Sequence, residues 1–290
     1  MEETKVSKVY IITGTSSGFG RAIAEAVLSR GDRAILTARK TESISDLVEK
    51  YPDTAIAVHM DVTNESDRQA VVQTAIESFG RIDVLVNNAG RGSLGAAEEF
   101  SLAQLREQME VNFIACAEMI RAVLPMMRSQ KSGHILNISS IGGRVNVGGF
   151  ALYGASKFAL EGYSEALYDE IKPLGIRVTI VEPGAFRTEF AGDSNIRPET
   201  TIPDYQPVIE PIRQYLYGSN GKQLGDPHKA ALVMIQVVES SDPPLRLMLG
   251  ADAYGLWDRK RAETDAEMAK WREVGEDTAF SDVNFVAIGG

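Results

Sequence analysis

The chain is short of cysteine and has no long apolar run. Its 290 residues include one cysteine, Cys116, so no intrachain disulfide can form and no cysteine cluster can hold a metal. We expect no metal site, and we interpret Cys116 as a small buried helix residue rather than a reactive thiol. No apolar run approaches the roughly 20 residues that a membrane span needs. Lys5 and Lys8 precede a strand-like segment, not the apolar region of a signal peptide. These absences favour a soluble, cytoplasmic protein.

The chain also has fewer basic than acidic residues. Lysine and arginine together number 30 against 40 acidic residues, so the formal net charge is −10. Such a surface repels nucleic acid and anionic lipid, and we expect neither as a partner. Hydrophobic residues at 44% and charged residues at 24% are typical of a globular protein. The expected partner is therefore a small molecule.

Short apolar segments alternate with longer amphipathic ones over the first two thirds of the chain. The apolar segments are largely β-branched at successive positions, which is typical of strands buried on both faces. The predicted strands are residues 9–13, 34–38, 55–60, 84–88, 134–139 and 177–183. Between them, apolar residues at helical spacing predict crossover helices, for example at 20–31 and 65–80. The alternation indicates an α/β protein with a doubly wound parallel sheet.

The pattern changes after the sixth strand. Residues 186–225 are rich in proline and polar residues, and we expect this segment to fold over a ligand as a substrate-binding lid. A helix at 226–240 follows, with Asp226 able to cap its start, then a seventh strand at 244–250 and a charged helix at 254–275. With no linker in sight, residues 1–290 are predicted to form a single nucleotide-binding domain, in which 251–290 is a C-terminal helical extension.

A glycine-rich turn joins the first strand to the first helix. It reads Thr-Gly-Thr-Ser-Ser-Gly-Phe-Gly over residues 13–20. Glycines allow a tight turn and close approach to a pyrophosphate, and the helix N-terminus offers N–H groups to the anion. The turn therefore predicts a dinucleotide, held by Gly14, Ser16, Ser17, Gly18, Phe19 and Gly20.

The end of the second strand indicates which dinucleotide binds. An acidic residue at this place would hold the ribose hydroxyl of NAD, whereas an arginine accommodates the 2′-phosphate of NADP. Here the strand is followed by Arg39 and Lys40, with no acidic residue at its tip. A guanidinium can clamp a phosphate with two hydrogen bonds, so we predict NADP(H) as the cofactor.

Several later motifs, in order and spacing, resemble the short-chain dehydrogenase/reductase family. They are Asp61-Val62 after the third strand, Asn87-Asn88-Ala89-Gly90 after the fourth, Asn112 in the next helix, Ser139-Ser140 after the fifth, Tyr153-Gly154-Ala155-Ser156-Lys157, and Pro183-Gly184 with Phe186 and Thr188 beyond. The resemblance spans roughly residues 8–250. It implies a three-layer Rossmann fold with a seven-stranded sheet, and it adds Asp61, Val62, Asn88, Ala89, Gly90, Pro183, Gly184, Phe186 and Thr188 to the expected cofactor contacts.

The resemblance also implies an enzyme that transfers a hydride between NADPH and a carbonyl or secondary alcohol. Tyr153 would be its acid/base, and Lys157, one helical turn away, would lower the pKa of the tyrosine. Lys157 would also bind the ribose, and Asn112 would support a proton relay. The family serine lies 13 positions before the tyrosine, which favours Ser140 over Ser139 as the group that orients the substrate oxygen.

The substrate is expected to be hydrophobic. Apolar residues occur in the lid and before Tyr153, namely Phe186, Phe190, Ile202, Tyr205, Val208, Ile209, Tyr215 and Leu216, with Val145, Val147, Phe150 and Leu152. They suit a ketone, an aldehyde, or a steroid-like or retinoid-like compound, as in a carbonyl reductase or ketoreductase, and the sequence does not rank these. Glu98 and Glu99 are interpreted as a solvated approach to a helix, not a carboxylate pair.

By resemblance, a homodimer would form through the helices near 101–130 and 153–172. The alternative function is a regulatory protein that senses NADP(H) without turnover. Such proteins typically lose the tyrosine or the lysine, and this chain retains both. An epimerase or dehydratase acting on nucleotide sugars is a further alternative, although those enzymes usually carry a longer C-terminal domain.

Overall fold

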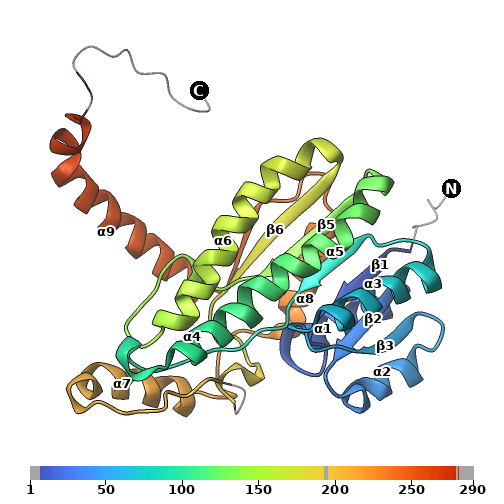
Figure 1. Cartoon of the computed structure of the whole chain (residues 1–290), viewed down its shortest axis with the longest axis horizontal. Coiled ribbons are helices and arrows are strands. Elements are labelled where there is room, and N and C mark those ends of the chain that lie inside the picture. Colours follow the sequence, from blue (N-terminus) through green and yellow to red (C-terminus); the bar gives the residue numbers. More distant parts are fainter. Residues whose placement is uncertain (1–6, 193–194, 279, 281–290) are drawn as a thin grey trace.

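The computed structural model describes residues 7–192, 195–278 and 280, which include a parallel sheet of seven strands between layers of helices (Figure 1). The strand order is β3-β2-β1-β4-β5-β6-β7, and every pairing is parallel. The strands are β1 (Val9–Ile12), β2 (Arg33–Ala38), β3 (Ala55–His59), β4 (Val84–Asn87), β5 (Gly133–Ile138), β6 (Ile176–Pro183) and β7 (Arg246–Leu249). The predicted doubly wound sheet is confirmed. The order reverses between β1 and β4, and ligands bind at such a switch point.

Two hydrophobic cores follow from the alternation of side chains along the strands. Ile12 faces one core with α1 and α8, whereas its neighbour Ile11 faces the other with α3, α5 and α6. The prediction of burial on both faces is wrong for β3, whose residues after Ala55 are half-buried or exposed because it is an edge strand. The helices are α1 (Gly18–Ser29), α2 (Ser45–Lys50), α3 (Glu65–Phe79), α4 (Leu102–Met109), α5 (Ala115–Gln130), α6 (Ala151–Ile171), α7 (Gln206–Gly218), α8 (Pro227–Glu239) and α9 (Ala251–Glu276).

The helix ends follow local chemistry. The Asp226 carboxylate accepts a hydrogen bond from the backbone N–H of His228 at 2.9 Å, and Pro227 opens α8, as predicted. Asn64 caps α3 in the same way, and Gly80 closes that helix in the left-handed region at φ 71°. These caps set the start of α8 and both ends of α3.

One helical segment differs from its simple prediction. Between α4 and α5 the chain forms a π-helical turn, Glu110–Ile114, that contains Asn112. π-turns widen a helix by one residue and are often found at functional sites. Within the helix expected near 101–130, the backbone hydrogen bonds therefore change to the i→i−5 pattern over this turn, as in the bond from the Ala115 N–H to the carbonyl oxygen of Glu110.

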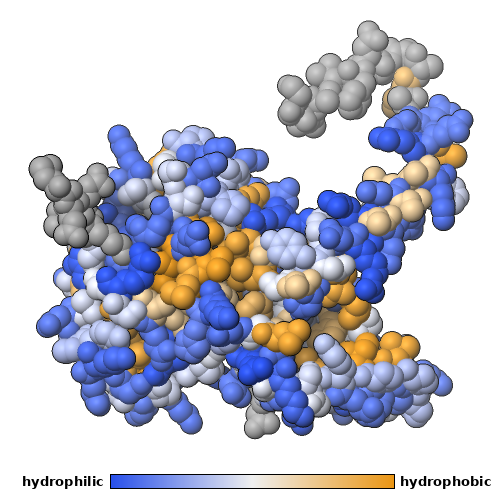
Figure 2. Space-filling model, turned by 180° about the vertical axis from the view of Figure 1, so that it is seen from behind, coloured by the Kyte–Doolittle hydropathy of each residue, from blue (hydrophilic) through white to orange (hydrophobic). Residues whose placement is uncertain are grey.

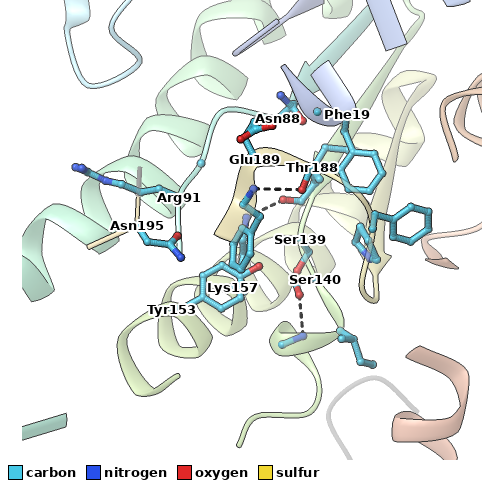
Figure 3. Close-up of a pocket in the computed structure, with 18 of the residues that line it drawn as sticks. Phe19, Asn88, Arg91, Ser139, Ser140, Tyr153, Lys157, Thr188, Glu189 and Asn195 are labelled. Carbon is cyan, nitrogen blue, oxygen red and sulfur yellow. Dashed lines mark hydrogen bonds between the residues drawn. The ribbon is translucent and has the colours of Figure 1, made fainter. Parts of the chain in front are cut away.

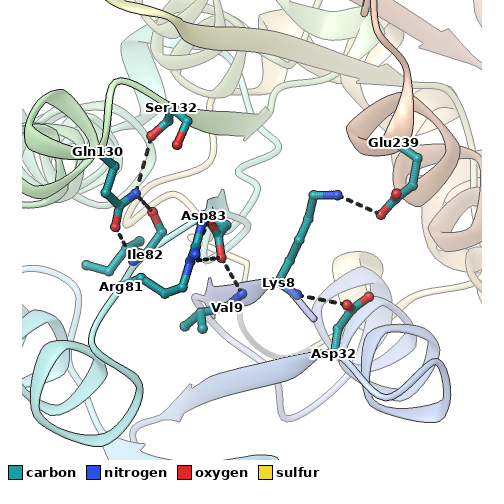
Figure 4. A network of polar contacts seen from close by, with 9 residues as sticks. All are labelled: Lys8, Val9, Asp32, Arg81, Ile82, Asp83, Gln130, Ser132 and Glu239. Atoms are coloured by element: carbon teal, nitrogen blue, oxygen red, sulfur yellow. Dashed lines mark hydrogen bonds and ion pairs between the residues drawn. The ribbon is translucent and has the colours of Figure 1, made fainter. Parts of the chain in front are cut away.

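Polar contacts fasten the amino-terminal edge of the sheet (Figure 4). Asp83 accepts a hydrogen bond from the backbone N–H of Val9 at 2.9 Å and pairs with Arg81. Lys8 donates its backbone N–H to Asp32 and pairs with Glu239 at the end of α8. This edge is thus occupied by contacts that hold strands and helices together, and the opposite, carboxyl-terminal edge is left for a ligand.

The lid segment, residues 186–225, contains the 3₁₀ turns Glu189–Ala191 and Pro203–Tyr205 and the helix α7. A bridge between Ser93 and Ile196 ties it to the loop after β4. Beyond β7, α9 projects away from the layered body (Figures 1 and 2). Of the predicted extension, residues 279 and 281–290 lie outside the described residues. Within the described part, no helix combines the length and apolar character that crossing a membrane requires.

Candidate active site

A large cavity of about 1380 Å³ opens at the carboxyl-terminal edge of the sheet. Its walls come from the turn after β1, the loops after β2 to β6, the start of α6, the lid segment and the base of α9. Figure 3 shows side chains from the turn after β1, the β5 loop, α6 and the lid converging on it. The topology places this cavity at the switch point of the sheet, where a nucleotide is expected.

The glycine turn forms a backbone cradle at one end of the cavity. Gly14 and Gly18 have φ of 70° and 57°, in the left-handed region that glycine tolerates. A side-chain carbon on Gly20 would lie 2.2 Å from the carbonyl oxygen of Gly14, so only glycine fits there. The Asn88 amide donates to the carbonyls of Thr13 and Gly14 at 2.8 and 2.9 Å. The motif after β4 thus braces the turn.

Two residues at the ends of β2 and β3 line the same end of the cavity. Arg39 directly follows β2, is exposed and lines the cavity there. The pKa of Asp61 is held below its ordinary value by hydrogen bonds from Thr63 and by the positive charges of Arg39 and Arg91. Asp61 is therefore an ionised acceptor at this end.

Most of the predicted cofactor residues line the cavity, and two do not. Those that do are Gly14, Ser16, Ser17, Gly18, Phe19, Arg39, Asp61, Val62, Asn88, Ala89, Gly90, Tyr153, Lys157, Pro183, Gly184, Phe186 and Thr188. Gly20 lies behind the turn, against Gly14. Lys40 is exposed but is absent from the cavity wall because the chain turns away from the sheet after Arg39.

Tyr153, Ser140 and Lys157 lie together in the cavity wall (Figure 3). Tyr153 and Ser140 both lie close to Gly142. A side-chain carbon placed on Gly142 would be 3.1 Å from the Tyr153 ring and 3.4 Å from Ser140 Oγ. Lys157 Nζ lies 5.9 Å from the centre of the Tyr153 ring and donates to the carbonyl oxygen of Ile138 at 2.8 Å. From the lid, Phe190 packs edge-on against Tyr153, with 5.2 Å between ring centres.

The electrostatics of Tyr153 differ from the sequence expectation. We expected the Lys157 ammonium to lower the pKa of the tyrosine, but burial raises it to about 12. A hydrogen bond with Ser140 opposes this rise. Burial also lowers the pKa of Lys157, whose ammonium is occupied by the Ile138 carbonyl. The effect of burial on the pKa of Tyr153 therefore outweighs that of the hydrogen bond with Ser140.

Asn112 is buried beside this group but does not line the cavity. Its amide donates to the carbonyl oxygen of Arg91 at 2.9 Å and to Ser156 Oγ at 3.0 Å, and its Oδ1 accepts from the Arg91 N–H. Its Oδ1 and Lys157 Nζ both lie within 4 Å of a side-chain carbon placed on Gly90. Asn112 thus ties the loop after β4 to α6 close to Lys157.

The sequence analysis missed a charged cluster beside Ser139, in which the buried carboxylates of Glu161 and Glu182 meet the partly exposed Arg144 and Arg246. Arg144 and Arg246 both reach Glu182 Oε1, at 3.1 and 3.3 Å, and Arg246 also lies 3.4 Å from Glu161. Burial raises the pKa of Glu161 to about 7. Ser139 is buried and lies near Glu161. A side-chain carbon placed on Gly143, which lies between them, would be close to both side chains. The sequence feature that could have indicated this cluster is the presence of charged residues within otherwise apolar segments.

Glu99 was interpreted wrongly. Only 1% of its surface is exposed, and its carboxylate accepts hydrogen bonds at 2.8 Å from the backbone N–H groups of Ala96 and Ile202. Gln206 donates to it as well, at 3.2 Å. Because Ile202 and Gln206 belong to the lid segment, Glu99 is an anchor for that segment.

The apolar part of the cavity is made by fewer residues than the sequence suggested. Val145, Val147, Phe150, Phe186, Phe190, Tyr215 and Leu216 line it, while Leu152, Ile202, Tyr205, Val208 and Ile209 do not. Ile209 is instead buried, with its Cδ1 near Gly149. The base of α9 contributes Asp252, Leu256 and Arg259, which the sequence reading did not assign to the pocket.

The residues present fit a dinucleotide. The left-handed glycines, the N-terminus of α1 behind them and the cation beyond β2 match the pyrophosphate and ribose positions of such a ligand. The cavity is also large enough to admit a substrate beside it, since ligand pockets are commonly about 300–1,000 Å³.

Comparisons with known proteins agree with this geometry. The family model of short chain dehydrogenases matches residues 8–199, and the chain belongs to that family of oxidoreductases. It is 38% identical over 270 residues to oxidoreductase BOA17 of Botryotinia fuckeliana, covering 93% of this chain and 98% of that one. It is 37% identical over 257 residues to a 3-ketodihydrosphingosine reductase of Bacteroides thetaiotaomicron, covering 88% and 92%.

Solved structures show the same fold. A short-chain dehydrogenase from Streptomyces avermitilis has a TM-score of 0.89 and 45% identity, covering 95% of this chain and all of that one. A short chain dehydrogenase from Burkholderia cenocepacia in complex with NADP has a TM-score of 0.70 and 26% identity, covering 91% and 97%. The family and its ligand-bound members support a nicotinamide cofactor for this chain.

Proposed function

We propose that this protein is an NADP(H)-dependent oxidoreductase that interconverts a carbonyl and a secondary alcohol on a hydrophobic substrate. The observation that carries the proposal is the convergence of Ser140, Tyr153 and Lys157 on the cavity that also contains the glycine cradle. A bound nicotinamide dinucleotide supplies or accepts the hydride. The protein has to hold the substrate oxygen and to move one proton.

Tyr153 is the proton donor for reduction and the acceptor for oxidation. Its hydroxyl is presented beside Ser140, so both can contact one substrate oxygen, and Ser140 donates to that oxygen as negative charge develops on it. With a pKa near 12 the phenol is fully protonated at neutral pH, which suits donation. For oxidation the phenolate must form, and a second positive charge in the cavity, beside Lys157, would favour it.

Lys157 and Asn112 have supporting roles in this proposal. Lys157 lies deep in the wall between Tyr153 and the loop after β4, where its ammonium can reach ribose hydroxyls. Asn112 holds that loop against α6 and lies near the ammonium, which suits a residue of a proton relay.

The choice of NADP(H) rests on Arg39. Arg39 lines the cavity directly after β2, the place at which an arginine accommodates the ribose 2′-phosphate of NADP, and no acidic side chain follows β2 directly. The relative from Burkholderia cenocepacia was solved with NADP. We expect Arg39→Asp to raise the KM for NADPH at least about 10-fold, because a charge-assisted hydrogen bond contributes about 1.5–3 kcal/mol, and to leave the KM for NADH nearly unchanged.

The measurement is initial-rate kinetics with both cofactors. Lys40→Asp is the matched control, since Lys40 carries the same charge next to Arg39 without lining the cavity. Equal changes in the two KM values for Arg39→Asp would contradict the assignment.

The substrate is proposed to be a hydrophobic ketone, aldehyde, or steroid-like or retinoid-like compound. Val145, Val147, Phe150 and Leu216 line the cavity on the side of Tyr153 and the lid. A 3-ketodihydrosphingosine reductase among the relatives acts, by its name, on a keto compound. We also propose that the protein is cytoplasmic and forms a homodimer. Leu102 of α4 and Phe158 of α6 are exposed, as such a dimer would need.

A spectrophotometric screen tests the function. NADPH and NADH are each combined with aliphatic, aromatic and steroid carbonyl compounds, and cofactor absorbance is followed. We expect NADPH to be consumed with at least one hydrophobic ketone or aldehyde. NADPH binding without consumption by any member of the panel would favour the sensor alternative.

A further inference from the structure

One buried amide in the cavity has no partner for its N–H groups. Asn195 belongs to the lid segment, lines the cavity and is only 7% exposed. Its Oδ1 accepts a hydrogen bond at 3.1 Å from the backbone N–H of Gly92, in the loop after β4. Because a backbone N–H can only donate, the amide oxygen faces Gly92 and the NH2 group is the end left for the cavity. Figure 3 shows the amide end of Asn195 directed toward Tyr153. Among the residues that the structure describes, none accepts a hydrogen bond from this NH2 group.

The position of the Asn195 amide is fixed by its neighbours. The next residue, Ile196, donates its backbone N–H to the carbonyl oxygen of Gly92 at 2.9 Å. A side-chain carbon placed on Gly92 would lie 2.7 Å from Asn195 Oδ1 and 2.6 Å from Phe190 Cζ, so only glycine permits this close approach. The amide is therefore held at a defined place before any ligand binds, and such preorganisation favours the recognition of one particular ligand group.

Asn195 lies on the side of the cavity where the substrate is expected. Phe190, which lies beside its amide, packs edge-on against Tyr153 with 5.2 Å between ring centres. The loop after β4, which holds Asn195, also meets the segment before α6 that supplies part of the apolar wall. There the Gly95 N–H donates to the carbonyl oxygen of Gly149 at 3.0 Å. Asn195 is therefore placed to contact a substrate near the group that Tyr153 protonates.

An unpaired donor in a covered pocket selects against a purely apolar ligand. A substrate that fills the cavity displaces water from the Asn195 NH2 group, and a substrate without an acceptor there would leave this donor unsatisfied, at a cost to binding. We propose that Asn195 is a specificity-determining residue that donates a hydrogen bond to a second oxygen of the substrate. The substrate is therefore a hydrophobic ketone or aldehyde with a further carbonyl, hydroxyl or ether oxygen close to the reacting carbon. This inference rests on the function proposed above.

The test compares matched substrates in assays of the full-length protein with NADPH. Each linear ketone is paired with keto esters of the same length, in which the ester carbonyl stands at successive positions along the chain. An ester is far less electrophilic than a ketone, so NADPH consumption reports reduction of the ketone. The readout is kcat/KM for the keto ester divided by kcat/KM for the ketone. For the best ester position we expect this ratio to be at least about 10 in the wild type, because the ketone leaves a buried donor unsatisfied.

Two variants remove the donor in different ways. Asn195→Leu removes the NH2 group at nearly constant size, and Asn195→Asp removes it but keeps an oxygen that can accept from the Gly92 N–H. We expect the ratio to fall at least about 5-fold in both variants. Glu99→Ala is the control, because it removes the hydrogen bond to the Ile202 N–H, a different anchor of the lid segment, and leaves the Asn195 amide in place. Its ratio should equal that of the wild type even where both KM values rise.

The outcomes separate this inference from the proposed function. Reduction of ketones with no preference for any keto ester, or with the same preference in both Asn195 variants, would overturn the role of Asn195 and leave the function intact. A higher KM for NADPH in Asn195→Leu at an unchanged ratio would assign the amide to the cofactor and also contradict the inference. If no ketone is reduced, the proposed function fails, and calorimetric titration of the same compounds into the NADPH complex decides on Asn195. Equal affinities of the wild type for ketone and keto esters would then overturn the inference.

Discussion

At the scale of single residues, the charged cluster of Arg144, Glu161, Glu182 and Arg246 is expected to contribute to stability. Glu182 is 1% exposed; it accepts a hydrogen bond from Arg144 and forms an ion pair with Arg246. Arg144 belongs to the turn that follows Ser140, and its other face is covered by Trp257. Removing the shared carboxylate would leave two guanidinium groups facing each other in a poorly hydrated place.

We expect Glu182→Gln to lower the free energy of unfolding by about 3 kcal/mol, at the lower end of the cost of breaking a buried pair because both arginines are partly exposed. Denaturant unfolding measures this. Glu165→Gln is the control: Glu165 pairs with the same Arg246 at 2.8 Å but is largely exposed, so its loss should cost less than about 1 kcal/mol. Equal losses in the two variants would show that burial of Glu182 is not what matters.

Glu161 makes stability depend on pH. Burial raises its pKa from 4.5 to about 7, so folding favours the neutral form. The stability that neutral Glu161 contributes is fully present below about pH 4.5 and is lost as pH rises through about 7. Relative to Glu161→Gln, which stays neutral, the wild type should lose up to about 3 kcal/mol across this range. Unfolding of both proteins at a series of pH values measures the difference, and a pH-independent difference would contradict the raised pKa.

Some of these residues could be predicted from the sequence and others could not. Ser140, Tyr153 and Lys157 could be predicted because a motif fixes their spacing in the chain. The partners of Glu182 could not, because Arg144 and Arg246 come from separate elements, and whether they meet Glu182 depends on tertiary packing. The pKa of Tyr153 was misjudged for the same reason: the burial that raises it is not visible in the sequence.

At the scale of elements, the lid segment is fastened by a side chain outside it. Glu99 accepts a backbone hydrogen bond from Ile202, and the lid residue Phe190 packs on Tyr153. Removing the Glu99 carboxylate should therefore favour conformations in which the lid segment no longer covers the cavity.

We expect Glu99→Ala to raise the KM for the carbonyl substrate roughly 10-fold, since losing a hydrogen bond to a charged group costs about 1.5–3 kcal/mol, with a smaller change in kcat. Limited proteolysis should cut the lid segment faster in this variant. Glu98→Ala is the control, because the hydrogen bond that joins Glu98 to the described part of the lid comes from the exposed Tyr205 hydroxyl. Unchanged KM and unchanged cleavage in Glu99→Ala would contradict the anchoring role.

Strands and long helices were predictable from periodicity, whereas short or irregular elements were not. All seven strands lie within two residues of their predicted bounds, because each is a compact apolar segment. The short helix α2 carries too little apolar pattern to be recognised, and the π-turn at Glu110–Ile114 depends on how α4 and α5 pack. Glu99 was misread because a charged pair normally indicates solvent.

At the scale of the whole molecule, the two edges of the sheet have different roles. The amino-terminal edge is held by ion pairs such as Lys8 with Glu239, and the carboxyl-terminal edge carries the cradle, the catalytic candidates and the lid. This division follows from parallel strands and right-handed crossovers, so the sequence could predict it once the alternation of strands and helices was recognised. The projection of α9 could not be predicted, because sequence alone does not show where a helix lies relative to a body.

The most direct test of the account is the turnover of Tyr153→Phe with NADPH and a carbonyl substrate identified in the screen. The substitution removes only the hydroxyl, so we expect NADPH to bind as in the wild type while kcat falls at least about 100-fold, the effect of losing a general acid. NADPH binding is measured by fluorescence titration in the same samples. Near-wild-type turnover in a variant that binds NADPH normally would contradict the central claim that Tyr153 moves the proton.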